Sequence, residues 1–339
     1  MKRLLAAVAA IALIGGAWWI RQNVIEGDDG GDAGGQLRLL CGTELEQACR
    51  RLADGDESIM LRVEPEGTTA DRLSSADAEV DFDAWLAAGP WAQIVADNRR
   101  VAGLEGDVLG DTGAVLGRSP VTVVGPRERV AALASHCGGT LTWVCLGDSS
   151  GQQWASVGGQ AAWGTVKAGL APPDGGAGLV ALDQAVADRT DRTDWDALDL
   201  QDAEPWLSQL VGVASVDPDP LNVQLTRPGS FSFSAPLEQA SGPRLAQAAN
   251  GGQYSLLYPE PMVTADVTLT AAAGQDVDDL LDRLGADRVG DELAADGWQV
   301  DGRTPARGVG SGPALPSGSQ LTSAGALQAL REQWEALRP

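Results

Sequence analysis

Residues 37–52 read LRLLCGTELEQACRRL, and this stretch decides the fold. It opens with a short apolar run, which suits a buried strand better than a helix of that length. Gly42 then allows a sharp turn, Thr43 is a good N-cap, and Glu46 stands where the second half of a capping box belongs. The apolar residues that follow recur at helical spacing and are expected to face the core: Leu45, Ala48, Cys49 and Leu52. The stretch therefore predicts a strand, a tight turn and a helix.

This turn is a candidate binding site as well as a fold signal. A helix that starts directly after a strand brings free backbone N–H groups to the carboxyl edge of a sheet. Open α/β sheets bind their ligands at that edge. Units of this kind also occur where nothing binds, so the turn predicts an α/β fold and leaves the ligand open.

The composition limits the classes of function. A chain of 339 residues with 44% hydrophobic residues can build two domains with real cores. The 24 basic and 47 acidic residues give a formal net charge of −23, which repels nucleic acid and anionic membrane surfaces. Lys2 and Lys167 are the only lysines, so an anion site would use arginine or backbone N–H groups.

Residues 1–25 are predicted to be a signal or anchor segment. A positive start precedes an apolar run over residues 4–20, which indicates export. The run either is cleaved after Gly15-Gly16-Ala17 or stays as a membrane anchor, which we favour. The positive-inside rule then places the bulk of the chain outside a single-pass membrane anchor, and the alternative is secretion after cleavage.

Beyond the apolar run, residues 26–36 are expected to form a flexible acidic linker with a reach of roughly 20 Å. From residue 37 onward short apolar runs alternate with helix-like segments, which predicts βα units and a mostly parallel sheet. The run SPVTVVGP at 119–126 is typical of one strand. The acidic, amphipathic segment 188–211 is expected to form two short helices broken at Pro205.

The four cysteines are expected to form disulfides, because an exported domain folds in oxidising surroundings. Four cysteines allow three connectivities. The local pairs, Cys41 with Cys49 and Cys137 with Cys145, are favoured, although Cα atoms more than about 7 Å apart could not be bridged. A CxxC motif and a Cys/His cluster are both absent from the sequence, so neither a redox motif nor a zinc site is indicated.

An enzyme is not indicated. The GDSSG at 147–151 is similar to the nucleophile loop of trypsin-like serine proteases, but the only histidine, His136, lies 13 residues before Ser149 rather than far upstream. Asp81 and Asp83 lack the spacing of a calcium loop. The sequence therefore predicts no catalytic residue, no metal site and no cofactor.

The chain resembles bacterial extracellular solute-binding proteins of the type II periplasmic-binding fold. The resemblance covers nearly all of 37–336 and rests on stretches that occur in the expected order: LRLLCGTELEQ, VDFDAWLAAGPW, GRSPVTVVGP, LTWVCL, VKAGLAPPDGGAGLVAL, SAPLEQA, YSLLYPEP, GWQVDGRTP and LQALREQWEAL. More narrowly, the chain is similar to the actinobacterial subgroup associated with von Willebrand factor A domains.

The resemblance implies an α/β fold of two lobes joined by two chain crossings, preceded here by the N-terminal hydrophobic helix. Lobe one would comprise 37–118 with 236–336, and lobe two would comprise 119–235. A ligand would lie in the cleft between them. The ligand-binding residues that the resemblance implies are Thr43, Glu44, Asp83, Trp85, Ser119, Glu238 and Gln239.

These residues match the family pattern in different ways. The Thr43 turn would face the cleft, and Asp83 begins an Asp-x-Trp that follows the third strand in the family. Ser119 marks the start of the first crossing. Glu238 continues a Ser-Glu-Gln motif in which Leu237 replaces the serine, so a hydroxyl contact is lost there. The aspartate-proline that usually precedes the aliphatic helix is also changed, to Pro-Pro-Asp.

Two classes of function follow from the resemblance. In the first, the protein captures an unknown small solute at the cell surface and delivers it to a membrane transporter or a sensor. In the second, it is a membrane-anchored ectodomain that contacts a protein, such as a von Willebrand factor A partner, and its cleft binds nothing. The lack of a cysteine at the end of the apolar run excludes a lipoprotein anchor and favours the second class slightly. Nucleic acid is not an expected partner.

Overall fold

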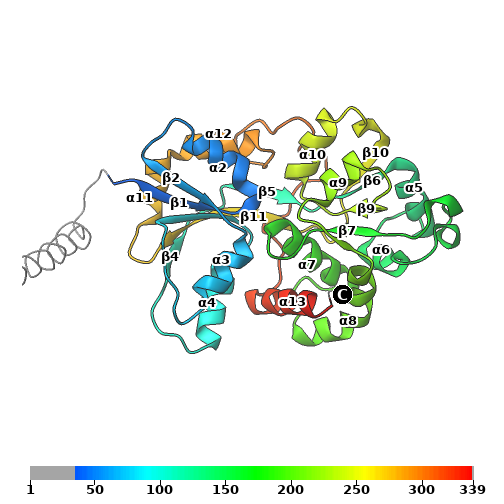
Figure 1. Ribbon diagram of the computed structural model, residues 1–339, viewed down its shortest axis with the longest axis horizontal. Helices are drawn as coiled ribbons and strands as arrows, with labels where there is room; N and C mark the ends of the chain where they lie inside the picture. Colours follow the sequence, from blue (N-terminus) through cyan, green and yellow to red (C-terminus); the bar gives the residue numbers. More distant parts are fainter. Residues whose placement is uncertain (1–34, 338–339) are drawn as a thin grey trace, which may run out of the picture. The chain divides into compact units, whose positions relative to one another are not determined.

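The computed structural model describes residues 35–337 of the chain, whose strands form two mixed sheets (Figure 1). The first sheet has six strands in the order β2-β1-β3-β11-β4, with β5 paired to β11. Its strands are β1 (Leu37–Cys41), β2 (Ile59–Val63), β3 (Ala84–Ala88), β4 (Leu109–Thr112), β5 (Gly117–Pro120) and β11 (Thr264–Ala272). The second sheet has five strands in the order β10-β6-β9-β7-β8. Its strands are β6 (Val123–Pro126), β7 (Ala168–Leu170), β8 (Ser215–Val216), β9 (Phe233–Ser234) and β10 (Tyr254–Leu257).

Helices accompany each sheet. We call the first sheet together with its helices the first half. Its helices are η2 (Thr43–Leu45), α2 (Glu46–Ala53), α3 (Glu66–Leu73), α4 (Trp91–Val101), α11 (Val277–Leu284) and α12 (Ala286–Ala295). The second half comprises the second sheet with α5 (Arg127–His136), α6 (Trp143–Ser149), η3 (Trp154–Val157), η4 (Ala161–Trp163), α7 (Gly176–Thr190), α8 (Ala197–Gly212), α9 (Pro220–Thr226), α10 (Glu238–Gln247) and η5 (Gly251–Gln253). The final helix, α13 (Ala324–Leu337), is assigned to neither half. In Figure 1, α2 and α12 lie on one side of the first sheet and α3 and α4 on the other.

The register of the first sheet fixes the position of the predicted turn. Strand β1 runs parallel to β3, with Leu39 opposite Ala84 and Cys41 opposite Leu86. The two strands therefore end at the same edge, where Gly42 donates its N–H to the carbonyl of Leu86. Both sheets are mixed rather than mostly parallel, because β11 is antiparallel to β3 and β6 is antiparallel to β9 and β10.

Both local disulfides are confirmed. Cys41 and Cys49 are bonded with a Cα–Cα distance of 6.6 Å, just inside the limit of about 7 Å that made this pair uncertain. Cys137 and Cys145 are bonded with a Cα–Cα distance of 5.8 Å. The first bond joins the end of β1 to α2, so it fixes the turn between them.

The predicted capping box at this turn is wrong, although the strand and the buried face of the helix are confirmed. The chain first makes the 3₁₀ turn η2, in which the N–H of Leu45 bonds to the carbonyl of Gly42. Helix α2 begins only at Glu46 and has no side-chain cap. The hydroxyl of Thr43 instead donates to the carboxylate of Glu44 at 3.2 Å. Glu44 therefore lies in the 3₁₀ turn, before α2 begins.

Two further segments differ from their predicted structure. The single strand expected at 119–126 is two strands, because β5 belongs to the first sheet and β6 to the second. The helix break expected at Pro205 does not occur, and α8 continues through it. The carbonyl of Gln201, which loses its helical partner there, belongs to an exposed residue on a helix face open to water.

The chain passes between the sheets twice, once between β5 and β6 and once between β10 and β11, as expected for two crossings. The predicted lobe one includes residues 236–336, yet β10 at 254–257 pairs with β6 in the second sheet. The lobe boundaries remain a prediction. The expected anchor at 1–25 and most of the 26–36 linker lie outside the described residues. Within residues 35–337 no helix combines the length and apolar character that a membrane span requires.

Candidate functional site

The N-terminus of α7 lies against the carboxyl edge of the first sheet. The chain reaches it from β7 through a loop that ends in Gly175, and α7 has no side-chain cap of its own. A Cβ on Gly175 would lie 2.5 Å from Oε1 of Glu44, and one on Gly176 would lie 2.2 Å from the carbonyl oxygen of Ala88. Only glycine permits this approach, so these residues bring the two halves into direct contact.

Glu44 takes the place of the missing cap. Its Oε1 accepts the N–H of Ala177, in the first turn of α7, at 2.9 Å. A carboxylate at this position satisfies a free N–H group and interacts favourably with the positive end of the helix dipole. The predicted Thr43–Glu44 turn therefore does face the other half, and it binds the protein itself there.

A second carboxyl lies beside Glu44. Glu66, the first residue of α3, is fully buried, and a Cβ on Gly42 would lie 2.0 Å from its Oε1. Burial, and then the negative charge of Glu44, raise the pKa of Glu66 well above its ordinary value of 4.5. This shift favours the neutral form of Glu66 beside the carboxylate of Glu44.

Ser119 and Gln239 lie together on the other side of the Glu44 turn. The backbone N–H of Gln239 donates to Oγ of Ser119 at 2.9 Å. The side-chain amide of Gln239 donates to Oδ2 of Asp296 at 3.1 Å and lies 3.5 Å from the carbonyl oxygen of Glu44. Burial raises the pKa of Asp296 to about 6, although Arg51 opposes the shift. The structure thus brings three of the predicted residues together.

Glu238 is buried beside this group and is fully used within the protein. Its carboxylate accepts hydrogen bonds from the hydroxyl of Tyr258, the side-chain amide of Gln299 and the N–H of Gly310. Burial, followed by the hydrogen bond to Glu238, raises the pKa of Tyr258. Glu238 therefore ties the second crossing to the segment after α12.

The structure does not bring Asp83 and Trp85 to the Glu44 turn. Asp83 precedes β3, at the opposite end of the strand, where its carboxylate accepts the N–H of Arg38 at 2.7 Å and bonds to the same guanidinium. Burial alone would raise the pKa of Asp83, but the bonds from Arg38 outweigh it and lower the pKa. Trp85 is buried in β3 opposite Leu40. Both residues hold the strand in place.

Sequence reasoning missed several residues of this contact. They are Glu66, the loop residue Asp174, the start of α7 at Ala177, and Arg331 of α13, which lies close by. The run Gly175-Gly176-Ala177-Gly178 gave a usable signal, because glycines at a helix start indicate a close approach. Arg331 gave none, since a single arginine in an amphipathic helix is usually exposed.

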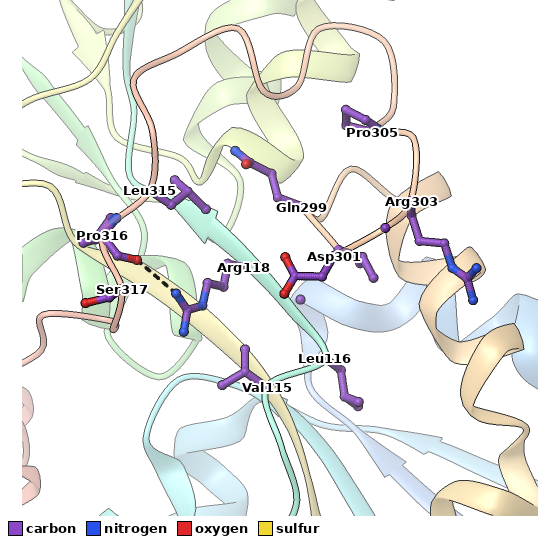
Figure 2. Close-up of a pocket in the computed structure, with 13 residues that line it drawn as sticks. Val115, Leu116, Arg118, Gln299, Asp301, Arg303, Pro305, Leu315, Pro316 and Ser317 are labelled. Atoms are coloured by element: carbon purple, nitrogen blue, oxygen red, sulfur yellow. Dashed lines mark hydrogen bonds between the residues drawn. The ribbon is translucent and has the colours of Figure 1, made fainter.

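A separate cavity in the described part of the chain lies along β5 (Figure 2). It has a volume of about 620 Å³ and is lined by residues 115–118, 299–303, 305 and 315–317. Arg118 donates to the carbonyl of Pro316 at 3.0 Å; Asp301 points toward Arg118, whereas Arg303 points away. None of the predicted ligand-binding residues lines this cavity. The described part of the chain also holds no group of three or more His, Cys, Asp or Glu side chains placed to bind a metal ion.

Comparison with known proteins shows the fold. No protein-family model and no curated protein matches the chain. A periplasmic thiamin-binding protein superposes with a TM-score of 0.59 at 11% identity, over 91% of this chain and 98% of the other. The periplasmic binding protein AfuA from Actinobacillus pleuropneumoniae, with fructose-6-phosphate bound, superposes with a TM-score of 0.57 at 12% identity, over 90% of this chain and 98% of the other. Iron-bound HitA from Pseudomonas aeruginosa superposes with a TM-score of 0.57 at 12% identity, over 89% of this chain and 99% of the other. The chain therefore has the mixed α/β fold of periplasmic binding proteins.

Proposed function

We propose that this protein binds a small solute outside the cytoplasm, between its two halves, for transport or sensing. The observation that carries the proposal is the bond between Ala177 of the second half and Glu44 of the first, at the edge where such sheets bind ligands. The fold supports the proposal, since two of the similar structures are described as periplasmic binding proteins and the third, HitA, as iron-bound. No group in the site is arranged as a nucleophile with a base, so no catalytic step is proposed.

The solute is expected to carry an anionic group. The start of α7 offers backbone N–H groups and a positive dipole end, and a carboxylate already binds there in the form of Glu44. A solute anion would displace the carboxylate of Glu44. This residue is only half-buried, so its side chain can turn outward. Thr43, Ser119 and Gln239 would surround it. Glu238 would support the site from beside it, and Asp83 and Trp85 would act at a distance by holding β3 in place.

A second candidate function is an ectodomain for protein contact, such as contact with a von Willebrand factor A protein, in which the cleft binds no solute. The observation that favours it is that the site is already filled. Glu44 caps α7, and the N–H of Gly67 in the first half bonds to the carbonyl of Asp174 in the second at 2.7 Å.

For the location we propose the outer face of the cell membrane, with residues 1–25 as a single-pass anchor. The two disulfides support an oxidising compartment. Mass spectrometry of the membrane fraction should find the segment attached. A mature chain beginning near residue 18 in the culture medium would establish secretion after cleavage instead.

A ligand screen with a matched pair of variants tests the solute proposal. Melting temperature should rise with one class of compound among organic acids, oxyanions, amino acids, sugars and cations; at 100 times Kd the stabilisation is about 2.7 kcal/mol. Glu44→Ala should respond more strongly to that class, because the internal competitor is gone. Glu46→Ala, an exposed carboxylate two residues away, should respond as the wild type does.

The screen also separates the two candidate functions. A class that stabilises the wild type and Glu44→Ala equally would contradict displacement at α7. If no class stabilises either protein, solute binding is refuted, and a partner protein bound equally by wild type and Glu44→Ala would support the contact function.

A further inference from the structure

Helix α13 spans both halves of the molecule. It packs against α4 of the first half and against α7 and α8 of the second (Figure 1). Its apolar face, which includes Leu327, Leu330 and Trp334, is fully buried in these contacts. A helix placed in this way has to release one half if the halves separate.

The chain just before α13 is fastened to the second half. The hydroxyl of Thr322 donates to the carbonyl of Trp195 at 2.5 Å, and its N–H donates to Oδ1 of Asp183, in the middle of α7, at 3.4 Å. Thr322 is itself buried. The start of α13 is therefore expected to move with the second half.

Further along α13, Arg331 reaches the first half. Its Nη1 and Nη2 donate to the two carboxylate oxygens of Asp71, on α3, at 2.9 and 3.0 Å. The guanidinium also lies over the ring of Trp91, the first residue of α4, at 5.4 Å from the centroid. The Arg331 side chain is only 6% exposed, whereas that of Asp71 is 59% exposed, so a buried guanidinium meets a carboxylate that faces water.

The same guanidinium also touches the second half. Its Nη2 lies 3.5 Å from Oδ1 of Asp174, in the loop before α7. A Cβ on Gly67 would lie 2.6 Å from this Nη2, so Arg331 covers the bond between Gly67 and Asp174. Arg331 thus sits above the backbone contact that joins the halves, with a carboxylate partner on each side.

From this geometry we propose that Arg331 is a positioning residue that clasps the two halves together and sets how readily they separate. When the halves part, α13 stays with the second half; Arg331 breaks its two bonds to Asp71 and its contact with Trp91. Asp174 travels with it and remains its partner, so the buried charge is never left alone. The clasp uses no solute and acts under either candidate function.

Amide hydrogen exchange followed by mass spectrometry tests the clasp, because two amides report contact between the halves. These are Gly67, bonded to Asp174, and Ala177, bonded to Glu44. The variant is Asp71→Asn, whose side chain is 59% exposed and leaves no cavity. Exchange in the peptides that carry both amides should rise about tenfold, which corresponds to about 1.4 kcal/mol. A peptide from β11, inside the first sheet, should not change.

Two further variants complete the test. Arg331→Lys keeps the charge but loses the two-pronged bond, so its exchange should lie between that of wild type and Asp71→Asn. Asp97→Asn removes a half-buried carboxylate from α4, where it pairs with Arg100, and should match wild type. Small-angle scattering should give a larger radius of gyration for Asp71→Asn than for Asp97→Asn.

Three results would overturn the proposal. They are unchanged exchange at both reporter amides in Asp71→Asn, a rise of the same size in the β11 peptide, or a rise in Asp97→Asn equal to that in Asp71→Asn. The first would mean that the Asp71 pair does not hold the halves. The second and third would mean that the variants loosen the fold as a whole. None of these readouts involves a solute, so the clasp can fail while solute binding stands, and the reverse.

Discussion

Asp183, in the middle of α7, gives a prediction that can be worked out from its surroundings. The residue is completely buried, and its Oδ1 accepts from the indole N–H of Trp195 at 3.0 Å and the N–H of Thr322 at 3.4 Å. Its Oδ2 has no hydrogen-bond partner in the described part of the chain. Burial raises the pKa of Asp183 to about 7, and the two hydrogen bonds reduce this effect only in part.

The sign and size of the effect on stability follow from this pKa. Below pH 3.8 the carboxyl is protonated in both the folded and the unfolded chain and contributes no difference. As the pH rises from 3.8 to about 7, the unfolded chain loses its proton while the folded protein keeps it, so the free energy of unfolding falls. Above that range the penalty is constant, and at 1.36 kcal/mol for each pKa unit it amounts to about 4 kcal/mol.

Asp183→Asn should remove this penalty, because the amide oxygen can still accept from Trp195 and Thr322 while the side chain stays neutral. Urea denaturation followed by tryptophan fluorescence, from pH 4 to pH 8, measures it. The variant should match wild type at pH 4 and exceed it by up to about 4 kcal/mol at pH 8. Asp202→Asn, at an exposed position on α8, is the matched control and should follow wild type throughout.

The comparison is made between proteins at each pH, so other titrating groups cancel. A difference between Asp183→Asn and wild type that stays constant over the whole range would refute the reasoning, since it would assign the effect to packing. A variant less stable than wild type at pH 8 would refute it as well.

Two further predictions concern the disulfides and the contact between the halves. Alkylation without reductant should label none of the four cysteines, and labelling of all four in the native protein would contradict both bonds. Each bridge closes a loop with a sequence separation of 8, so its reduction should lower the free energy of unfolding by about 2 to 3 kcal/mol. Gly176→Ala places a Cβ 2.2 Å from the carbonyl of Ala88 and should lower the free energy of unfolding in urea by about 1 to 3 kcal/mol. Gly212→Ala, where no atom lies within 4 Å, is its control, and equal stability of the two variants would contradict the close contact.

The sequence predicted the local structure well where side-chain periodicity carries the information. The strand before Gly42, the buried face of α2 and both disulfides follow from residues close together in the chain. The run at 119–126 shows the limit of such reasoning. Its central residues, VTVV at 121–124, have high strand propensity, yet the chain changes sheets at Val121, which forms an isolated bridge with Leu237. Strand propensity indicates an extended backbone but does not indicate which neighbouring strand the segment pairs with.

The candidate site was predictable only in part, for a related reason. The turn pattern located Thr43 and Glu44, because a glycine after a strand has a defined position at the sheet edge. The partner Ala177 is 133 residues away, and no local pattern connects the two. The resemblance implied that Asp83 and Trp85 follow the third strand, and the sequence around them does not itself indicate which end of a strand Asp83 occupies. The strand β3 begins after Asp83, so that carboxylate lies at the edge away from Glu44.

The bond between Glu44 and α7 has a quantitative consequence for solute affinity. Glycines occupy the start of α7, so the helix has no side-chain cap of its own and takes one from the other half. A cap of this kind contributes about 1 kcal/mol. A solute anion that binds the same N–H group has to displace Glu44 first, so its apparent affinity is lowered about fivefold relative to an uncapped helix. That factor is small enough for a solute with several contacts to overcome. The filled site in this structure is therefore compatible with solute binding, and Glu44→Ala measures the competition directly.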